Sequence, residues 1–112
     1  MAELARRLRA LGGTPEAILE NATLMALMEP VIRADLLAAE QYHPPAREVL
    51  PYDITVLAAT SDQAISADSL QAWRDHTTGT FQIKWFEGQH FFVTKNGTAV
   101  VEYLAEMLRS MR

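Results

Sequence analysis

Asp62 and His90 are the residues of this sequence whose types and spacing best suit acid–base chemistry. Asp62 closely follows an apolar, β-branched run at residues 54–59, and His90 closely follows a second apolar run at residues 81–86. Both runs are typical of buried strands. The carboxyl ends of neighbouring parallel strands meet at one edge of a sheet, where α/β proteins place their sites. The order Asp then His matches the last two members of a Ser…Asp…His triad.

The first member of such a triad has no counterpart among the 112 residues. There is no Gly-x-Ser-x-Gly turn, and none of the four serines lies in a turn of that kind. The sequence therefore predicts half of a hydrolase site, with Asp62 as the acid and His90 as the base. A single aspartate and a single histidine this far apart are more often surface residues, and at this point that interpretation stays open.

The first part of the sequence, residues 1–43, contains only helical patterns. An amphipathic stretch ends at Gly12-Gly13, and Thr14-Pro15 predicts a new helix, with the threonine as N-cap and the proline at the first helical position. Pro30 should break this helix or begin another one that runs to about Tyr42. Three prolines then predict a linker at residues 44–52.

The remaining residues, 53–112, alternate strand, helix, strand and helix. Ser66 is expected to cap the first of these helices. Asn96-Gly97 also fits a hairpin turn, but the apolar period after it is three to four residues, which favours a helix. Two tryptophans, Trp73 and Trp85, are expected in the core. The order predicts a βαβα unit with parallel strands, a partial α/β fold.

A parallel sheet of only two strands is rarely stable alone, because parallel sheets need both faces and both edges covered. The missing strands are expected from another chain, from a second copy, or from sequence beyond these residues. We therefore expect the isolated chain to self-associate rather than stay a simple monomer.

Composition excludes several classes of function. The formal charge of −4 and the scattered basic residues argue against nucleic acid as the main partner. The sequence has no cysteine, and its three histidines lack ligand spacing, so neither a metal site nor another cofactor is expected. No apolar run is long enough to cross a membrane, and the first residues lack a signal-peptide pattern. A cytoplasmic protein is the default expectation.

Four short motifs carry a resemblance to a known family. They are Leu11-Gly12-Gly13-Thr14-Pro15, Pro30-Val31-Ile32-Arg33-Ala34-Asp35, Ala72-Trp73-Arg74-Asp75-His76-Thr77 and Gly88-Gln89-His90-Phe91-Phe92. In this order and spacing, the sequence resembles the C-terminal half of the type II thioesterases that serve nonribosomal peptide and polyketide synthases, which have the α/β-hydrolase fold. Ala59 and Gln89 depart from the family pattern, in which both positions are glycine.

The resemblance implies an enzyme that removes misloaded acyl groups from the phosphopantetheine arms of acyl or peptidyl carrier proteins. It implies that Asp62 is the catalytic acid and His90 the general base. The family's N-terminal half, with the nucleophilic serine and the oxyanion amides, has no counterpart in these residues.

The resemblance also implies that residues 1–43 form a helical lid, with Arg33, Met25 and Met28 near the substrate entrance. The residues alone also allow a plainer interpretation. In it, Arg33 lies on a solvated helix surface, and the two methionines belong to a core rather than to an adaptable apolar lid surface.

Three hypotheses about function follow. The chain is the acid-and-base half of a thioesterase, as a fragment of a longer chain or one piece of a split enzyme. Alternatively, it is a non-catalytic module that binds a carrier protein or a synthase. In the third hypothesis it is an interaction domain that associates with itself through exposed strand edges.

Overall fold

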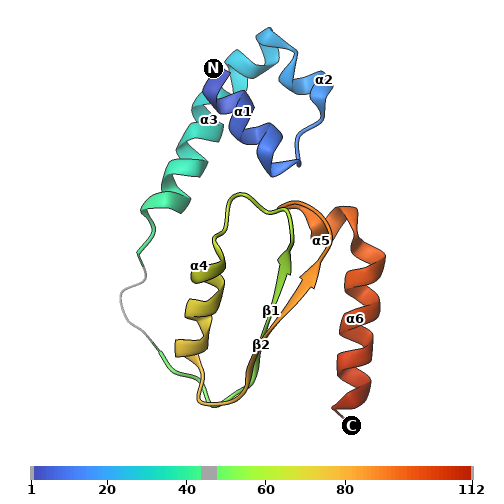
Figure 1. The fold of residues 1–112 in the computed structure, drawn as a ribbon. Helices are drawn as coiled ribbons and strands as arrows, with labels where there is room; N and C mark the ends of the chain where they lie inside the picture. Colours follow the sequence, from blue (N-terminus) through green and yellow to red (C-terminus); the bar gives the residue numbers. More distant parts are fainter. Residues whose placement is uncertain (1, 44–47, 112) are drawn as a thin grey trace. The chain divides into compact units, whose positions relative to one another are not determined.

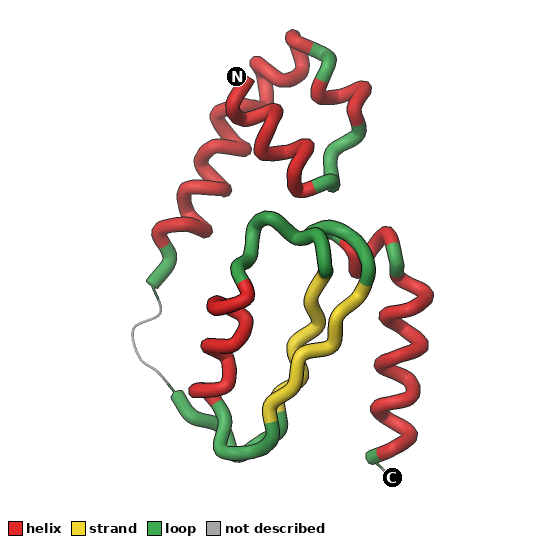
Figure 2. Tube along the Cα trace, viewed as in Figure 1, coloured by secondary structure: helices red, strands yellow, loops and turns green. Residues whose placement is uncertain are grey.

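The computed structural model describes residues 2–43 and 48–111 and divides the chain into two compact units, Met1–Glu48 and Val49–Arg112. The first unit is helical, and the second combines two strands with helices (Figures 1 and 2). Each unit has its own core of apolar side chains.

The first unit consists of α1 (Ala2–Leu11), α2 (Glu16–Leu19) and α3 (Ala22–Gln41). Gly12 follows α1 with a φ of 81°, a backbone conformation that glycine adopts readily and that commonly ends helices. The Asn21 side chain caps α3 by accepting a hydrogen bond from the amide of Leu24. The core of this unit is apolar and is built from all three helices: Leu4, Leu8, Leu19 and Met25.

Three of the predicted helix boundaries are wrong. The single helix expected between Pro15 and Pro30 is interrupted at Glu20 and Asn21, where α2 has ended and α3 has not yet begun. The N-cap of α2 is Pro15 rather than Thr14, so the helix begins one residue later than expected. Pro30 neither breaks nor begins a helix, because α3 runs through it. A proline within a helix leaves the carbonyl four residues earlier, here that of Ala26, without its amide partner. Both residues are exposed, so we attribute the tolerance of Pro30 to water that can solvate this carbonyl.

The second unit has the predicted order of strands and helices. Its elements are β1 (Ile54–Ala59), α4 (Ala67–Gln71), the 3₁₀ helix η1 (Ala72–His76), β2 (Phe81–Phe86), α5 (Phe92–Lys95) and α6 (Gly97–Ser110). The strands pair in parallel from Ile54–Phe81 to Ala59–Phe86. Ser66 caps α4 by accepting from the Ser69 amide, as expected. The helix after Asn96 is also confirmed, and it excludes the alternative hairpin.

The two faces of the strand pair are covered by different helices. In Figure 1, α4 lies on one side of the strands and α6 lies on the other. Ala59 and Phe86 are register partners and share a core with Phe92 and with Val100 of α6. The Phe86 and Phe92 rings stack with centroids 5.5 Å apart. This packing holds the start of α5 next to the carboxyl ends of both strands.

The opposite ends of the strands are held by hydrogen bonds from the residues that precede them. Leu50 pairs with Thr77 in an isolated parallel bridge, so part of the predicted linker is an ordered part of this unit, while positions 44–47 lie outside the described residues. Asp53 Oδ1 accepts from the Thr80 amide at 2.9 Å, and this backbone hydrogen bond lowers the pKa of Asp53. Throughout residues 2–43 and 48–111, every helix is too short or too polar to cross a membrane.

Candidate active site

The carboxyl ends of β1 and β2 bring Asp62 and His90 together, although 28 residues separate them in sequence. His90 Nδ1 lies 3.0 Å from Asp62 Oδ2. The carboxylate is the more buried partner, with 12% of its side chain exposed against 36% for the imidazole. The Asp62 carboxylate is therefore largely shielded from solvent, while part of the His90 imidazole is accessible from outside the protein.

The second oxygen of Asp62 is also engaged. Oδ1 accepts a hydrogen bond from the Ala64 amide at 2.8 Å, which fixes the plane of the carboxylate. Sequence reasoning missed this bond, but the signal was present, because aspartate side chains commonly accept from the amide two residues later. With both oxygens directed by protein donors, Asp62 has one orientation toward His90.

This arrangement determines which imidazole nitrogen can act as a base. An ionised carboxylate only accepts hydrogen bonds, so we assign the ring proton of neutral His90 to Nδ1 and the free lone pair to Nε2. Among the described residues, no other side chain hydrogen bonds to this imidazole. His90 Nε2 is therefore available to take a proton from a nucleophile.

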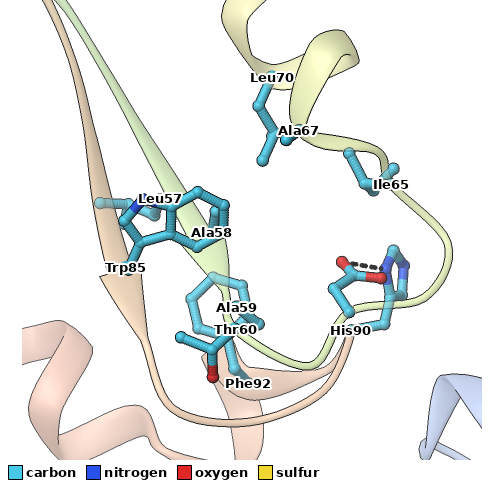
Figure 3. A pocket seen from close by; sticks show the side chains of 11 residues that line it. Leu57, Ala58, Ala59, Thr60, Ile65, Ala67, Leu70, Trp85, His90 and Phe92 are labelled. Atoms are coloured by element: carbon cyan, nitrogen blue, oxygen red, sulfur yellow. Dashed lines mark hydrogen bonds and ion pairs between the residues drawn. The ribbon is translucent and has the colours of Figure 1, made fainter.

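A pocket of about 380 Å³ lies beside the Asp62–His90 pair. Figure 3 shows Trp85 and Leu57 on the strand side, and Leu70 on α4 across from them, with the His90 imidazole at one end. Most of the pocket wall is apolar, and among the described residues that line it only Asp62 and His90 have ionisable side chains. The site thus combines a hydrogen-bonded aspartate–histidine pair with an apolar cavity.

Trp85 contributes to this wall rather than to a closed core, so the expectation that both tryptophans are core residues is wrong. About half of each of Trp73 and Trp85 is exposed to solvent. Residues of a strand alternate between the two faces of a sheet, so Trp85 points to the opposite face from the buried Phe86.

The residues predicted near the substrate entrance all lie on α3 of the first unit, in different environments. Arg33 Nε donates to Glu29 Oε1 at 2.6 Å, one helical turn away, and this hydrogen bond lowers the pKa of Glu29. Met25 is 3% exposed and belongs to the core, whereas Met28 is 41% exposed. Of the two methionines, only Met28 presents a substantial surface.

This difference gives a prediction about stability. Met25→Ala should destabilise the helical unit by about 2–5 kcal/mol, because it removes buried apolar atoms and leaves a cavity. Met28→Ala is the matched control, since it makes the same chemical change on the same helix and should cost less than about 1 kcal/mol. Urea titrations followed through the methyl NMR signals of Leu4 and Leu8 would measure both effects. Equal losses of stability would contradict the assignment of Met25 to the core.

A family model now identifies the chain. The model of the thioesterase domain matches residues 1–108, which is nearly the whole sequence and includes both Asp62 and His90. The chain belongs to the thioesterase domain family. The predicted family is thereby confirmed.

The most similar curated thioesterase relatives include the gramicidin S biosynthesis protein GrsT of Aneurinibacillus migulanus. The thioesterase domain described here is 31% identical to GrsT over 107 residues, which cover 96% of this chain and 42% of GrsT. The chain thus spans less than half the length of this relative.

Solved structures agree with this result. ClbQ from the colibactin NRPS/PKS pathway matches with a TM-score of 0.74 and 32% identity, over 94% of this chain and 45% of ClbQ. The type II thioesterase BorB from the borrelidin biosynthetic cluster matches with a TM-score of 0.69 and 32% identity, over 94% of this chain and 43% of BorB. These structural neighbours are thioesterases of the α/β-hydrolase fold, so the predicted fold class is also confirmed.

Proposed function

We propose that this chain provides the acid and the base of a serine-type thioesterase that hydrolyses acyl groups from the phosphopantetheine arms of carrier proteins. The observation that carries the proposal is the 3.0 Å contact between Asp62 and His90 beside an apolar pocket, in a chain of the thioesterase family. The relatives named for gramicidin S and for the colibactin NRPS/PKS pathway support the class of substrate.

In this mechanism His90 acts first as a base and then as an acid in each half of the reaction. Nε2 takes the proton of a serine hydroxyl as the serine oxygen attacks the thioester carbonyl, and it then gives that proton to the departing thiolate. In the second half of the reaction, Nε2 takes a proton from the water that attacks the acyl-enzyme, and it gives this proton to the serine oxygen as the carboxylic acid is released. Asp62 keeps the imidazole in the Nδ1–H tautomer and stabilises the imidazolium that forms.

The serine nucleophile belongs, in this proposal, to a segment outside the 112 residues. Two of the four serines are engaged with each other, since the Ser66 and Ser69 hydroxyls lie 2.8 Å apart. The named relatives are more than twice as long as the matched region. A two-stranded parallel sheet with open edges also needs further strands. A companion segment or a second copy could supply these strands, and we favour the companion segment because it also supplies the serine.

Residues 1–43 act as a lid in this proposal, and residues 53–112 form the C-terminal part of the catalytic core. The exposed Met28 and the Arg33–Glu29 pair would line the substrate entrance, while Met25 supports the lid from within. The apolar pocket suits an acyl chain rather than a charged substrate. The carrier-protein partner and the cytoplasmic location remain predictions.

The test compares the chain alone with a chimera that joins it to the part of GrsT outside the matched region. The isolated chain should show no turnover of an acyl-loaded carrier protein, because the members of a triad act as a unit. The chimera should hydrolyse the thioester, with intact GrsT as the positive control. A cooperative unfolding transition must first show that the chimera is folded.

Two outcomes would contradict the proposal. Turnover by the purified isolated chain that disappears in His90→Ala would show that no external nucleophile is needed. A folded chimera that binds the loaded carrier protein without hydrolysing it would favour the alternative of a non-catalytic binding module.

A further inference from the structure

The pairing between the two strands continues into the loops that carry Asp62 and His90. After the last register pair, the Thr60 amide donates to the Phe86 carbonyl and the Ser61 amide to the Gly88 carbonyl, both at 2.9 Å. Ser61 directly precedes Asp62, and Gly88 lies two residues before His90. One backbone hydrogen bond therefore joins the acid loop directly to the base loop.

The second of these bonds depends on an unusual conformation at Gly88. Its φ is +136°, which residues with a side chain rarely adopt. A Cβ at this position would also lie 3.3 Å from Cβ of Phe92. Phe92 is buried and stacked on Phe86, so it has little freedom to move aside. Both the conformation and the contact therefore require glycine.

Further hydrogen bonds hold the loop on either side of Gly88. The Asn96 side chain donates through Nδ2 to the Glu87 carbonyl at 3.3 Å, and the Phe92 amide donates to the Gln89 carbonyl at 3.0 Å. The loop is thus tied to the start of α6 and to α5, and through Gly88 to the residue before Asp62. Of these ties, the Gly88 bond is the one that reaches the acid loop.

We propose that Gly88 is the positioning residue of this site: its conformation turns its carbonyl toward the Ser61 amide and thereby sets the Asp62–His90 contact. Gly88 has no side chain and acts only through its backbone, so it takes no part in the proton transfers. This inference deepens the proposed function and rests on it for its catalytic meaning. The geometric claim itself can be tested on the chain without any nucleophile.

The test uses the full chain with ¹⁵N-labelled histidine and reads which imidazole nitrogen of His90 carries the proton. The tautomer of a histidine is visible in its ¹⁵N shifts when the imidazole is neutral, because the two ring nitrogens are then distinct. Wild-type His90 should be the Nδ1–H tautomer, because Asp62 accepts from that nitrogen. In Gly88→Ala we expect the Nδ1–H tautomer to be no longer the main form of neutral His90. Gly97→Ala is the matched control, since a Cβ there meets nothing within 4 Å, and it should leave the His90 signals unchanged.

A second measurement covers the case in which Gly88→Ala does not fold. In the wild-type chain, a scalar coupling across the hydrogen bond from the Ser61 amide to the Gly88 carbonyl should be detectable. Its absence would overturn the proposal, and so would a folded Gly88→Ala chain with unchanged His90 tautomer.

Kinetics then separate this inference from the proposed function. In the active chimera, Gly88→Ala should lower kcat by about 10²-fold with little change in KM, as expected for a misplaced catalytic group. If the chimera is inactive while the NMR results hold, the proposed function fails and the positioning role in the Asp62–His90 contact stands. If the chimera is active and Gly88→Ala leaves kcat unchanged, the positioning role fails.

Discussion

His90→Ala should reduce thioester hydrolysis by the GrsT chimera by about 10⁶-fold, which is the scale seen when a triad base is removed from a serine hydrolase. In the proposed mechanism, the change removes Nε2, the atom that takes the serine proton and returns it to the leaving thiolate. Because binding contacts elsewhere are retained, the loss should fall on kcat. Single-turnover rates with an acyl-loaded carrier protein would measure it.

The matched control for this prediction is His76→Ala in the same unit. His76 packs against the Trp73 ring with centroids 5.5 Å apart and does not line the pocket beside Asp62. This variant should retain near wild-type turnover. Full activity in a folded His90→Ala chimera would end the assignment of this site, whatever the family relationship.

Asp62→Asn should reduce kcat by about 10⁴-fold, which is the cost recorded for the same change in another serine hydrolase. The substitution preserves the size of the side chain, so it tests the chemistry of the carboxylate. An asparagine that accepts from the Ala64 amide through its oxygen turns its NH₂ group toward His90. The imidazole must then accept at Nδ1 and carry its proton on Nε2, where it cannot act as a base.

Two readouts together check this prediction. The rate should fall in Asp62→Asn but not in Asp68→Asn, which makes the same change in the first turn of α4. The ¹⁵N shifts of His90 should move from the Nδ1–H to the Nε2–H tautomer in Asp62→Asn alone. A lower rate without a change of tautomer would mean that Asp62 acts through its charge rather than by orienting the histidine.

The acid–base pair could be predicted because it follows from local patterns. Two apolar runs identify strands, an intervening helix makes them parallel, and residues just beyond parallel strands meet at one edge. The Asp62–His90 contact needs no knowledge of distant parts of the chain. The same reasoning identified the Ser66 cap and the helix after Asn96.

The misjudged features depend on information that a pattern does not carry. Pro30 was expected to interrupt a helix, but the effect of a missing amide depends on whether the freed carbonyl can be solvated. Trp85 was expected in the core because it is large and apolar, yet its strand position turns it toward the pocket. For Met25 and Met28 the sequence left core and lid surface open, because their burial depends on which face of α3 packs against α1 and α2.

The loops that carry Asp62 and His90 are joined by main-chain atoms, a connection that any residue other than proline could make at Ser61. The side chains that shape the pocket, such as Ile65, Leu70 and Trp85, take no part in that connection. If the proposed function holds, exchanging them should alter the room for an acyl group without moving Asp62 relative to His90. We expect this separation to let selection change the preferred substrate and keep the reaction chemistry intact, so that one catalytic edge can serve biosynthetic pathways with different products.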